Sequence, residues 1–319
     1  MSVANTPGVL IVGHGLIGAA VRAMLLAQRL PVTSVGRRQT ELPGYLALDL
    51  ASEAGRAGLH MALEDLRPRC LLLVHGPSDV TWTDANSAAA AAVHCGVAAI
   101  AASSGIPVIL VSTDNVFPGT RGGYCPDDPV EPANHYGQVK ALAERAVLAV
   151  APALVLRVSL VYGWAGAGLR GTFAQRCLRA AAEGRPLSAP VDQSFTPVHV
   201  RDVATVLAAA CRAAGWRSAG HVTGIRHLAG PAELSRHEFA RLAFDLAGAD
   251  ISLVRPCLRR DTEWACRPRF SSLACGTFAD LPGLQTWQPM APSAGLRDML
   301  ATRPAVSGLA ELSLAERVF

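Results

Sequence analysis

The feature that most constrains the fold is a glycine loop between a strand pattern and a helix pattern near the start of the chain. The aliphatic run of residues 8–12 predicts a strand buried on both faces. It leads into the GxGxxG sequence of residues 13–18, and helical spacing of apolar side chains follows. In this context the loop predicts a dinucleotide site, because the free N–H groups of a helix N-terminus bind phosphates. A purely structural turn is the alternative. The predicted cofactor contacts in the loop are Gly13, Gly15, Leu16, Ile17 and Gly18.

Strand and helix patterns then alternate through the first half of the chain. The further predicted strands are residues 31–35, 46–48, 70–74, 108–111 and 154–158. This alternation predicts an α/β fold with a Rossmann-type, doubly wound parallel sheet. Beyond Gly163 the rhythm weakens, but residues 172–175 and 235–238 fit capping boxes that begin helices. A smaller second domain is therefore expected.

Several classes of protein are excluded by composition and spacing. A net charge of +4 from scattered basic residues gives no electrostatic footprint for nucleic acid. The eight cysteines have no CxxC spacing, so we expect no metal site and free thiols in a reducing cytoplasm. Residues 87–111 are apolar, yet His94, Ser103 and Pro107 divide them into a helix, a turn and a strand rather than a membrane span. We expect a cytoplasmic protein with no membrane partner.

The end of the second predicted strand indicates which dinucleotide binds. An NAD site places Asp or Glu there, whereas this chain has Arg37 and Arg38 and no acidic residue before Glu41. Guanidinium groups suit the 2′-phosphate of NADP because they bind phosphate with two donors. The alternative is a solvated pair of arginines. The sequence favours NADPH over NADH.

Lys140 is the only lysine among 29 basic residues. Coding bias toward Arg explains the others, so the remaining lysine indicates a site that needs an ammonium group. Tyr136 precedes it by four residues, and the two would share one face of a helix. A nearby ammonium lowers a tyrosine pKa from about 10. Tyr136 could then exchange a proton with a substrate oxygen while hydride moves.

Polar residues also follow the predicted strand 108–111. Ser112, Thr113 and Asp114 stand at its carboxyl end, where open parallel sheets bind ligands. A hydroxyl there could bind the substrate carbonyl together with Tyr136, and an ordinary strand-ending turn is the alternative.

Longer motifs carry a resemblance to a known family. The run 111–119 reads VSTDNVFPG, and residues 136–140 read YGQVK. Together they resemble the extended short-chain dehydrogenase/reductases, and most closely the dTDP-4-dehydrorhamnose reductase family. The resemblance continues through residues 156–163, 192–197, 201–204, 227–230 and 267–273, the last beginning Arg267-Pro268.

The resemblance implies a Rossmann NADP-binding domain over residues 1–162. It implies a smaller α/β substrate-binding domain over residues 163–319, from which segments near 198–210 and 225–230 return to the first. The implied chemistry is NAD(P)H-dependent reduction of a nucleotide-linked 4-keto-6-deoxy sugar. Members often dimerise, although the sequence shows no interface signature.

The family's roles also transfer by position. Thr113 would orient the ketone and Tyr136 would donate the proton. Lys140 would hold the nicotinamide ribose, Asp49 would lie by the adenine, and Asp114 would line the substrate side.

Departures from the family pattern limit the substrate assignment. Asn115 and Leu160 stand where the family has Tyr and Trp in its sugar pocket, and residues 75–77 read HGP instead of an Asn-Ala-Ala stretch. Losing two aromatic rings changes the pocket, so we expect a related ketosugar nucleotide rather than 4-dehydrorhamnose, in a secondary-metabolite deoxysugar pathway. Alternatives are a nucleotide-sugar epimerase or dehydratase, or a non-catalytic NADP-binding regulatory subunit.

Overall fold

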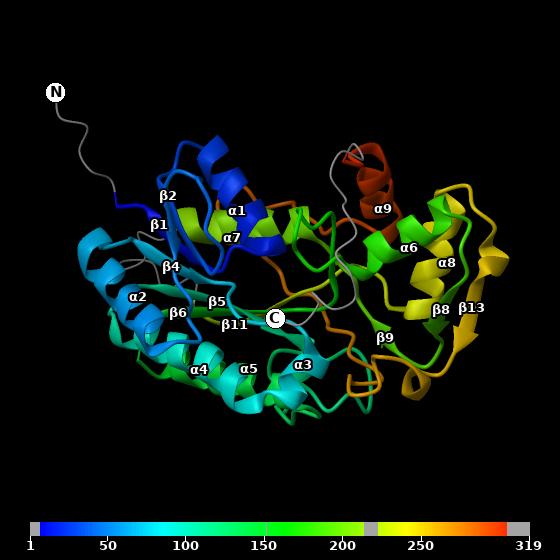
Figure 1. Ribbon diagram of the computed structural model, residues 1–319, viewed down its shortest axis with the longest axis horizontal. Coiled ribbons are helices and arrows are strands. Elements are labelled where there is room, and N and C mark those ends of the chain that lie inside the picture. The colour runs from blue at the N-terminus through cyan, green and yellow to red at the C-terminus, as the bar shows by residue number, and fades with distance from the viewer. Residues whose placement is uncertain (1–6, 151, 214–222, 305–319) are drawn as a thin grey trace.

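A seven-stranded parallel sheet forms the centre of the molecule, with strand order β11-β6-β5-β4-β1-β2-β3. The computed structural model describes residues 7–150, 152–213 and 223–304 (Figure 1). The strands are β1 (Val9–Val12), β2 (Val32–Gly36), β3 (Tyr45–Ala47), β4 (Cys70–Leu73), β5 (Val108–Thr113), β6 (Ala153–Val158) and β11 (Gly224–Leu228). The order reverses beside β1, as in a Rossmann fold. The predicted fold class is confirmed.

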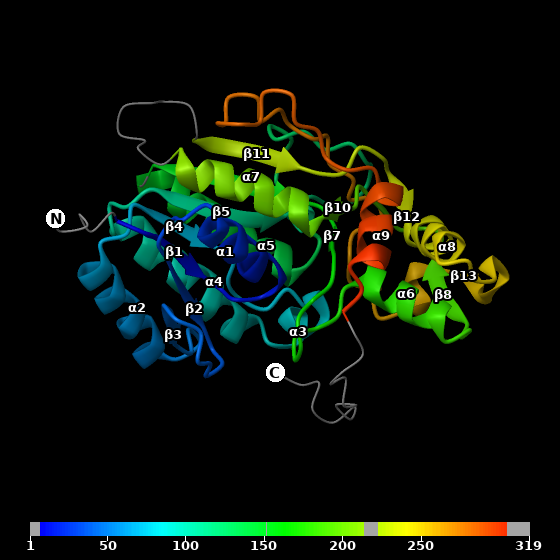
Figure 2. The same cartoon turned by 90° about the horizontal axis from the view of Figure 1, so that it is seen from above.

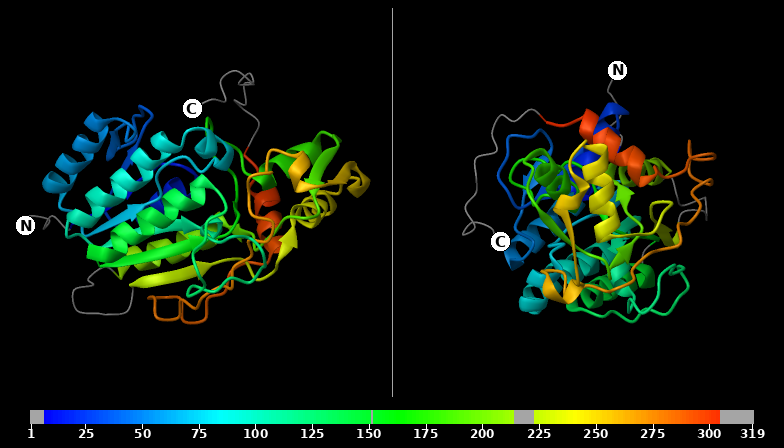
Figure 3. Two further views of the ribbon diagram at one scale, coloured as in Figure 1. Left: turned by 90° about the horizontal axis from the view of Figure 1, so that it is seen from below. Right: turned by 90° about the vertical axis from the view of Figure 1, so that its right-hand side faces the viewer.

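Helices cover both faces of this sheet because successive strand side chains point to opposite sides. In β1, Val9 and Ile11 join one buried cluster while Leu10 and Val12 join the other. The helices are α1 (Leu16–Ala27), α2 (Glu53–Leu66), α3 (Val80–Ala85), α4 (Ser87–Ser103), α5 (His135–Val150) and α7 (Val200–Arg212). Helices α1 and α7 lie side by side over one face (Figure 2). Helices α2, α4 and α5 cover the other (Figure 3).

Helices α6, α8 and α9 lie beyond one end of the sheet (Figure 1). They contribute to a third buried cluster, which contains the aromatic side chains of Phe173, Phe239 and Trp264. The helices and strands in this part are β7 (Val161–Tyr162), α6 (Phe173–Ala182), β8 (Leu187–Pro190), β9 (Ser194–Phe195), β10 (Val198–His199), β12 (Leu234–Ser235), α8 (Arg236–Leu246), β13 (Val254–Cys257) and α9 (Pro292–Ala301). Short 3₁₀ turns lie at η1 (Asp114–Val116), η3 (Ile251–Leu253) and η4 (Arg259–Asp261). Both predicted capping boxes are present, at the starts of α6 and α8. A domain boundary at residue 163 stays a prediction, and the last residues of the second domain, 305–319, lie outside the described part.

Two local predictions can be compared directly with the structure. The predicted strand 108–111 was too short, because β5 continues through Thr113 and pairs Ser112 with Arg157. Residues 87–111 form α4, a turn and β5, as predicted. Across the described ranges, no helix combines the length and apolarity needed to cross a bilayer.

Leu72 in β4 tests the central packing, because it is fully buried between neighbouring strands and helices. Leu72→Ala should lower the free energy of unfolding by about 2–5 kcal/mol through lost burial and a cavity. Met61→Ala on α2 is the matched control, since Met61 is 63% exposed, and should change it by about 0.5 kcal/mol or less. Denaturant unfolding measures both. Equal effects would contradict the described core.

Candidate active site

The glycine loop fits a dinucleotide at the carboxyl end of β1. Gly13 has φ +113°, and a Cβ there would lie 2.6 Å from the Val74 carbonyl oxygen, so only glycine is accommodated. Around Gly15, by contrast, an added Cβ would meet nothing within 4 Å. Helix α1 has no side-chain cap and no acidic residue in its first turn. No side chain at the N-cap therefore competes for its first N–H groups, which can receive an anionic phosphate.

The other predicted cofactor residues lie around this loop. Arg37 and Arg38 follow β2 and are exposed, and Asp49 is exposed just beyond β3. Arg38 donates to the carbonyl of Gly168, in the connection between β7 and α6. His14, within the glycine loop, is half-buried and packs edge-on against Tyr45, with the ring centroids 5.4 Å apart.

Thr113, Tyr136 and Lys140 come together at the carboxyl end of β5. Asn134 begins α5, because its side-chain oxygen accepts the Gly137 N–H at 2.8 Å. The next turns of α5 carry Tyr136 and Lys140. Thr113 lies near enough to Tyr136 for its hydroxyl to favour the phenolate and lower the pKa of Tyr136. The predicted hydroxyl pair is thus present in the structure, although its catalytic role stays a prediction.

The expected effect of Lys140 on Tyr136 is wrong in this structure. Burial raises the pKa of Tyr136 to about 12, and Asp114 adds to the rise, while Arg267 and the Thr113 hydroxyl oppose it. Lys140 Nζ instead donates to the Val111 carbonyl at 2.6 Å. Burial lowers the pKa of Lys140 to about 8. The ammonium is directed at the sheet backbone, so the cation that favours the Tyr136 phenolate is Arg267.

Asp114 and Asn115, predicted to face the substrate, are buried in a hydrogen-bond network. Asp114 accepts hydrogen bonds from Asn115 at 2.7 Å and Ser271 at 2.8 Å. Asn115 in turn accepts from Asn134 at 3.0 Å. Burial raises the pKa of Asp114 despite these donors. The network joins the end of β5 to the start of α5 and to the segment carrying Ser271.

Leu160, the third predicted substrate residue, is half-buried and packs against the third cluster. The structure does not test its contact with a sugar.

Two arginines with no predicted role, Arg236 and Arg267, lie beside this network. Arg236 is 3% exposed, and its guanidinium lies over the rings of Trp264 and Phe173 at 4.4 and 4.8 Å. Its Nε donates to Gln193 at 2.6 Å. Arg267 is near enough to Asp114 and Tyr136 for their charges to raise its pKa, against a larger lowering by burial. Within the described residues, neither arginine has a carboxylate within ion-pair distance. The buried Arg236 and the half-buried Arg267 therefore favour an anionic ligand.

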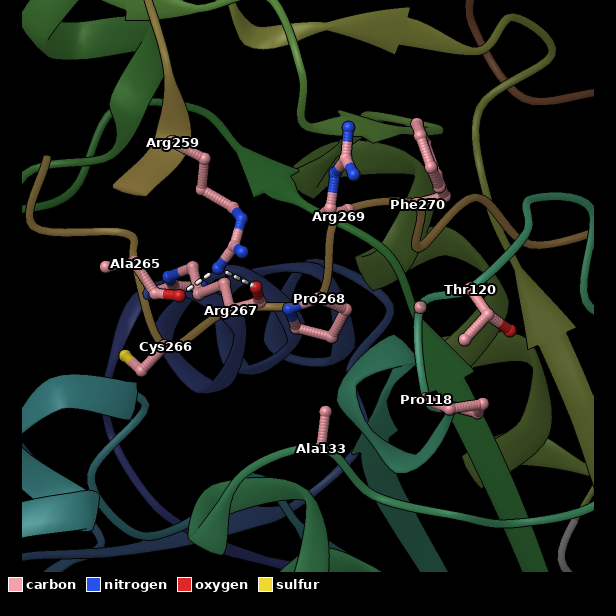
Figure 4. A pocket seen from close by; sticks show the side chains of 11 residues that line it. Pro118, Thr120, Ala133, Arg259, Ala265, Cys266, Arg267, Pro268, Arg269 and Phe270 are labelled. Atoms are coloured by element: carbon pink, nitrogen blue, oxygen red, sulfur yellow. Dashed lines mark hydrogen bonds between the residues drawn. The ribbon is translucent and has the colours of Figure 1, made fainter. Parts of the chain in front are cut away.

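Arg267 also lines a cleft of about 570 Å³ (Figure 4). Arg259 and Arg269 line the same cleft (Figure 4). Arg259 donates a hydrogen bond to the Arg267 carbonyl at 2.8 Å. Ala133, three residues before Tyr136, lies on the opposite wall. The sequence signal that could have indicated this wall is the Arg267-Pro268 motif.

Two buried histidines, His75 and His94, lie close to Tyr136. The His94 ring is 5.9 Å from the Tyr136 ring and 5.5 Å from that of His75. Among the residues that the structure describes, neither ring nitrogen of His75 has a hydrogen-bond partner. Burial, with a smaller contribution from Lys140, lowers the pKa of His75 to about 3, so both imidazoles are neutral at pH 7. Nowhere in the described ranges do three or more His, Cys, Asp or Glu side chains gather as metal ligands do.

The family model described as RmlD substrate binding domain matches residues 8–299. The chain belongs to this family. A dTDP-4-dehydrorhamnose reductase of Mycobacterium tuberculosis is 32% identical to it over 256 residues, which are 72% of this chain and 79% of that one.

A further relative and a solved structure extend the comparison. A probable dTDP-4,6-dihydroxy-2-methyloxan-3-one 4-ketoreductase of Streptomyces antibioticus is 30% identical over 68% of this chain and 73% of its own length. A crystal structure of dTDP-4-dehydrorhamnose reductase from Bacillus anthracis, in complex with NADP, has a TM-score of 0.76. It is 21% identical and covers 93% of this chain and 99% of its own, so it supports the fold.

The raised pKa of Tyr136 predicts how this RmlD-family protein titrates without cofactor. Around pH 10 an ordinary tyrosine is half ionised, whereas Tyr136, with a pKa of about 12, should remain a neutral phenol. Near-ultraviolet titrations of the wild type and Tyr136→Phe should therefore coincide up to about pH 10.5. An ionisation near pH 10 that disappears in the variant would contradict the described burial.

Proposed function

We propose that this protein is an NADPH-dependent reductase of a nucleotide-linked 4-keto-6-deoxy sugar. The observation that carries the proposal is the Tyr136–Thr113 hydroxyl pair at the end of β5, next to a glycine loop open to phosphate. Membership of the RmlD family supports it, as do relatives named as reductases of dTDP-linked sugars. Residues 1–162, together with returning segments near 198–210 and 225–230, would form the cofactor domain, and the remainder would chiefly bind substrate.

The residues around the loop fit NADP, the ligand in the complex of the Bacillus anthracis reductase. Gly13, Gly15, Gly18 and the N–H groups of Leu16 and Ile17 would hold the pyrophosphate. Arg37 and Arg38 would bind the 2′-phosphate, Asp49 would lie by the adenine, and Lys140 would hold the nicotinamide ribose. The reduced nicotinamide supplies the hydride in this chemistry.

The protein's own contribution is the proton. Since its pKa is about 12, Tyr136 carries its proton at neutral pH and can donate it to the ketone oxygen as the alcohol forms. The Thr113 hydroxyl lies near Tyr136 and would orient the same oxygen. Arg267 lowers the cost of the phenolate that remains.

The substrate would lie in the region between the sheet and the third cluster. Arg236 and Arg267 supply the positive charge that a nucleotide diphosphate needs. Asp114, Asn115 and Leu160 would line the part of the site that holds the sugar. The proposed pathway is deoxysugar biosynthesis for a secondary metabolite; the Streptomyces antibioticus relative, named as a probable 4-ketoreductase of a dTDP-linked compound, supports the ketoreduction step. The proposal includes a cytoplasmic location and a homodimer.

Tyr136→Phe tests the proton donor. With a panel of nucleotide-linked 4-keto-6-deoxyhexoses, the wild type should consume NADPH with one member, and the variant should turn over at least about 100-fold more slowly. NADPH binding should persist, since the ring remains. Tyr162→Phe makes the same chemical change in the third cluster and should keep turnover.

Other results would contradict the proposal. Undiminished reduction by Tyr136→Phe would remove Tyr136 from the mechanism. Co-purified NAD with no net NADPH consumption would indicate an epimerase or dehydratase. Tight NADPH binding without turnover of any panel member, together with a stable protein partner, would indicate a regulatory subunit.

Arg38→Met tests the cofactor preference. Losing a charge-assisted contact to phosphate should weaken NADPH binding by about 10-fold or more. NADH, which has no 2′-phosphate, is the internal control and should bind the variant and the wild type equally. Titration of intrinsic fluorescence measures both affinities, and an equal loss for the two cofactors would mean that Arg38 does not contact the 2′-phosphate.

A further inference from the structure

A buried ion pair lies directly behind the active-site helix. Glu144 follows Lys140 by one turn of α5, and Arg157 lies on β6. Arg157 Nη2 and Nε donate to the Glu144 carboxylate at 2.8 and 3.1 Å, and the two side chains are 1% and 4% exposed. Ser112 Oγ on β5 donates to the same carboxylate. One carboxylate therefore joins a helix to two neighbouring strands.

The position of this pair relates it to the reacting groups. Ser112 immediately precedes Thr113, and Ser112 pairs with Arg157 across β5 and β6. On the helix, residues four apart are neighbours on one face, which places Glu144 beside Lys140 and Lys140 beside Tyr136. The carboxylate thus fixes α5 against the strand that carries Thr113.

Stability alone is a weak reason for burying these charges. Removing two ions from water costs several kcal/mol each, and well-packed apolar residues often stabilise a core equally well. The Arg157 charge is matched by Glu144, but Lys140 Nζ is also buried, and its hydrogen bond within the described part of the chain is to an uncharged carbonyl. Glu144 is the carboxylate next to it.

We propose that Glu144 is a positioning residue that holds α5 against β5 and keeps the buried Lys140 charged beside the active site, a role that rests on the cofactor contact proposed for Lys140. The groups around Lys140 support it. Burial lowers the pKa of Lys140 to about 8, and Glu144, followed by Cys95 on α4, opposes that fall. The other titratable neighbours, His94 on α4 and His75 after β4, are neutral. Glu144 itself faces Arg157 on β6 and Ser112 on β5.

The test removes both charges of the ion pair so that neither is left buried alone. The double variant Glu144→Gln/Arg157→Met is compared with the wild type, with Lys140→Met and with Asp280→Asn. The last is a matched control, because Asp280 pairs with Arg226 at 2.6 Å on β11. The NADPH dissociation constant is measured by fluorescence from about pH 6 to 10, alongside kcat and melting temperature.

The charge of Lys140 decides in which direction the pH midpoint of NADPH binding should move. Its charge is present below the pKa, so wild-type affinity should fall as pH rises through about 8. Without Glu144 the ammonium loses its proton more readily, and the fall should occur about one pH unit lower. Asp280→Asn should follow the wild type. A purely structural role for Glu144 would change melting temperature or kcat without moving this midpoint.

Each failure has its own signature. A double variant that is folded and keeps the wild-type midpoint overturns the role of Glu144. Wild-type binding by Lys140→Met at every pH overturns instead the cofactor contact in the proposed function. Where the double variant does not fold, Glu144→Asp, which keeps the charge, should retain the wild-type midpoint, and Glu144→Gln should lower it; equal midpoints overturn the proposal.

Discussion

The parallel pairing of β1, β4, β5 and β6 is the constraint on which the site depends. Because all four strands end at the same edge, residues far apart in the sequence meet there. The register pairs Thr113 with Val158, one position beyond the pairing of Ser112 with Arg157. A slip of one residue would turn the Thr113 hydroxyl to the opposite face. The backbone hydrogen bonds between the strands therefore determine where the Thr113 side chain lies, independently of its side-chain contacts.

Loss of water shifts the protonation of the groups at this edge in a consistent direction. It raises the pKa of Tyr136 and lowers those of Lys140 and His75, so each group is biased toward its neutral form. Charged neighbours then oppose the bias selectively: Arg267 acts on Tyr136, and Glu144 acts on Lys140.

Local patterns predicted much of the fold and part of the site. The strand of residues 8–12, the glycine loop and both capping boxes are short-range signals, and each appears almost where it was expected. The pKa of Tyr136 could not be predicted from its spacing to Lys140, because spacing does not say where an ammonium points. Arg236 and Arg267 were missed for a related reason. Both arginines lie beside the site because segments far along the sequence pack against β5 and α5. A local sequence pattern does not predict such long-range packing.

The course of the chain has a consequence for how the molecule can be divided. After passing through β7 to β10, the backbone returns to place α7 against α1, with Val203, Val206 and Leu207 fully buried there. It returns again to add β11 beside β6. A chain cut after residue 162 would therefore lack one wall of the sheet and expose the apolar side of α1. The half of the molecule built on the seven-stranded sheet is encoded discontinuously, so transplanting it into another protein requires three separate stretches of sequence rather than one.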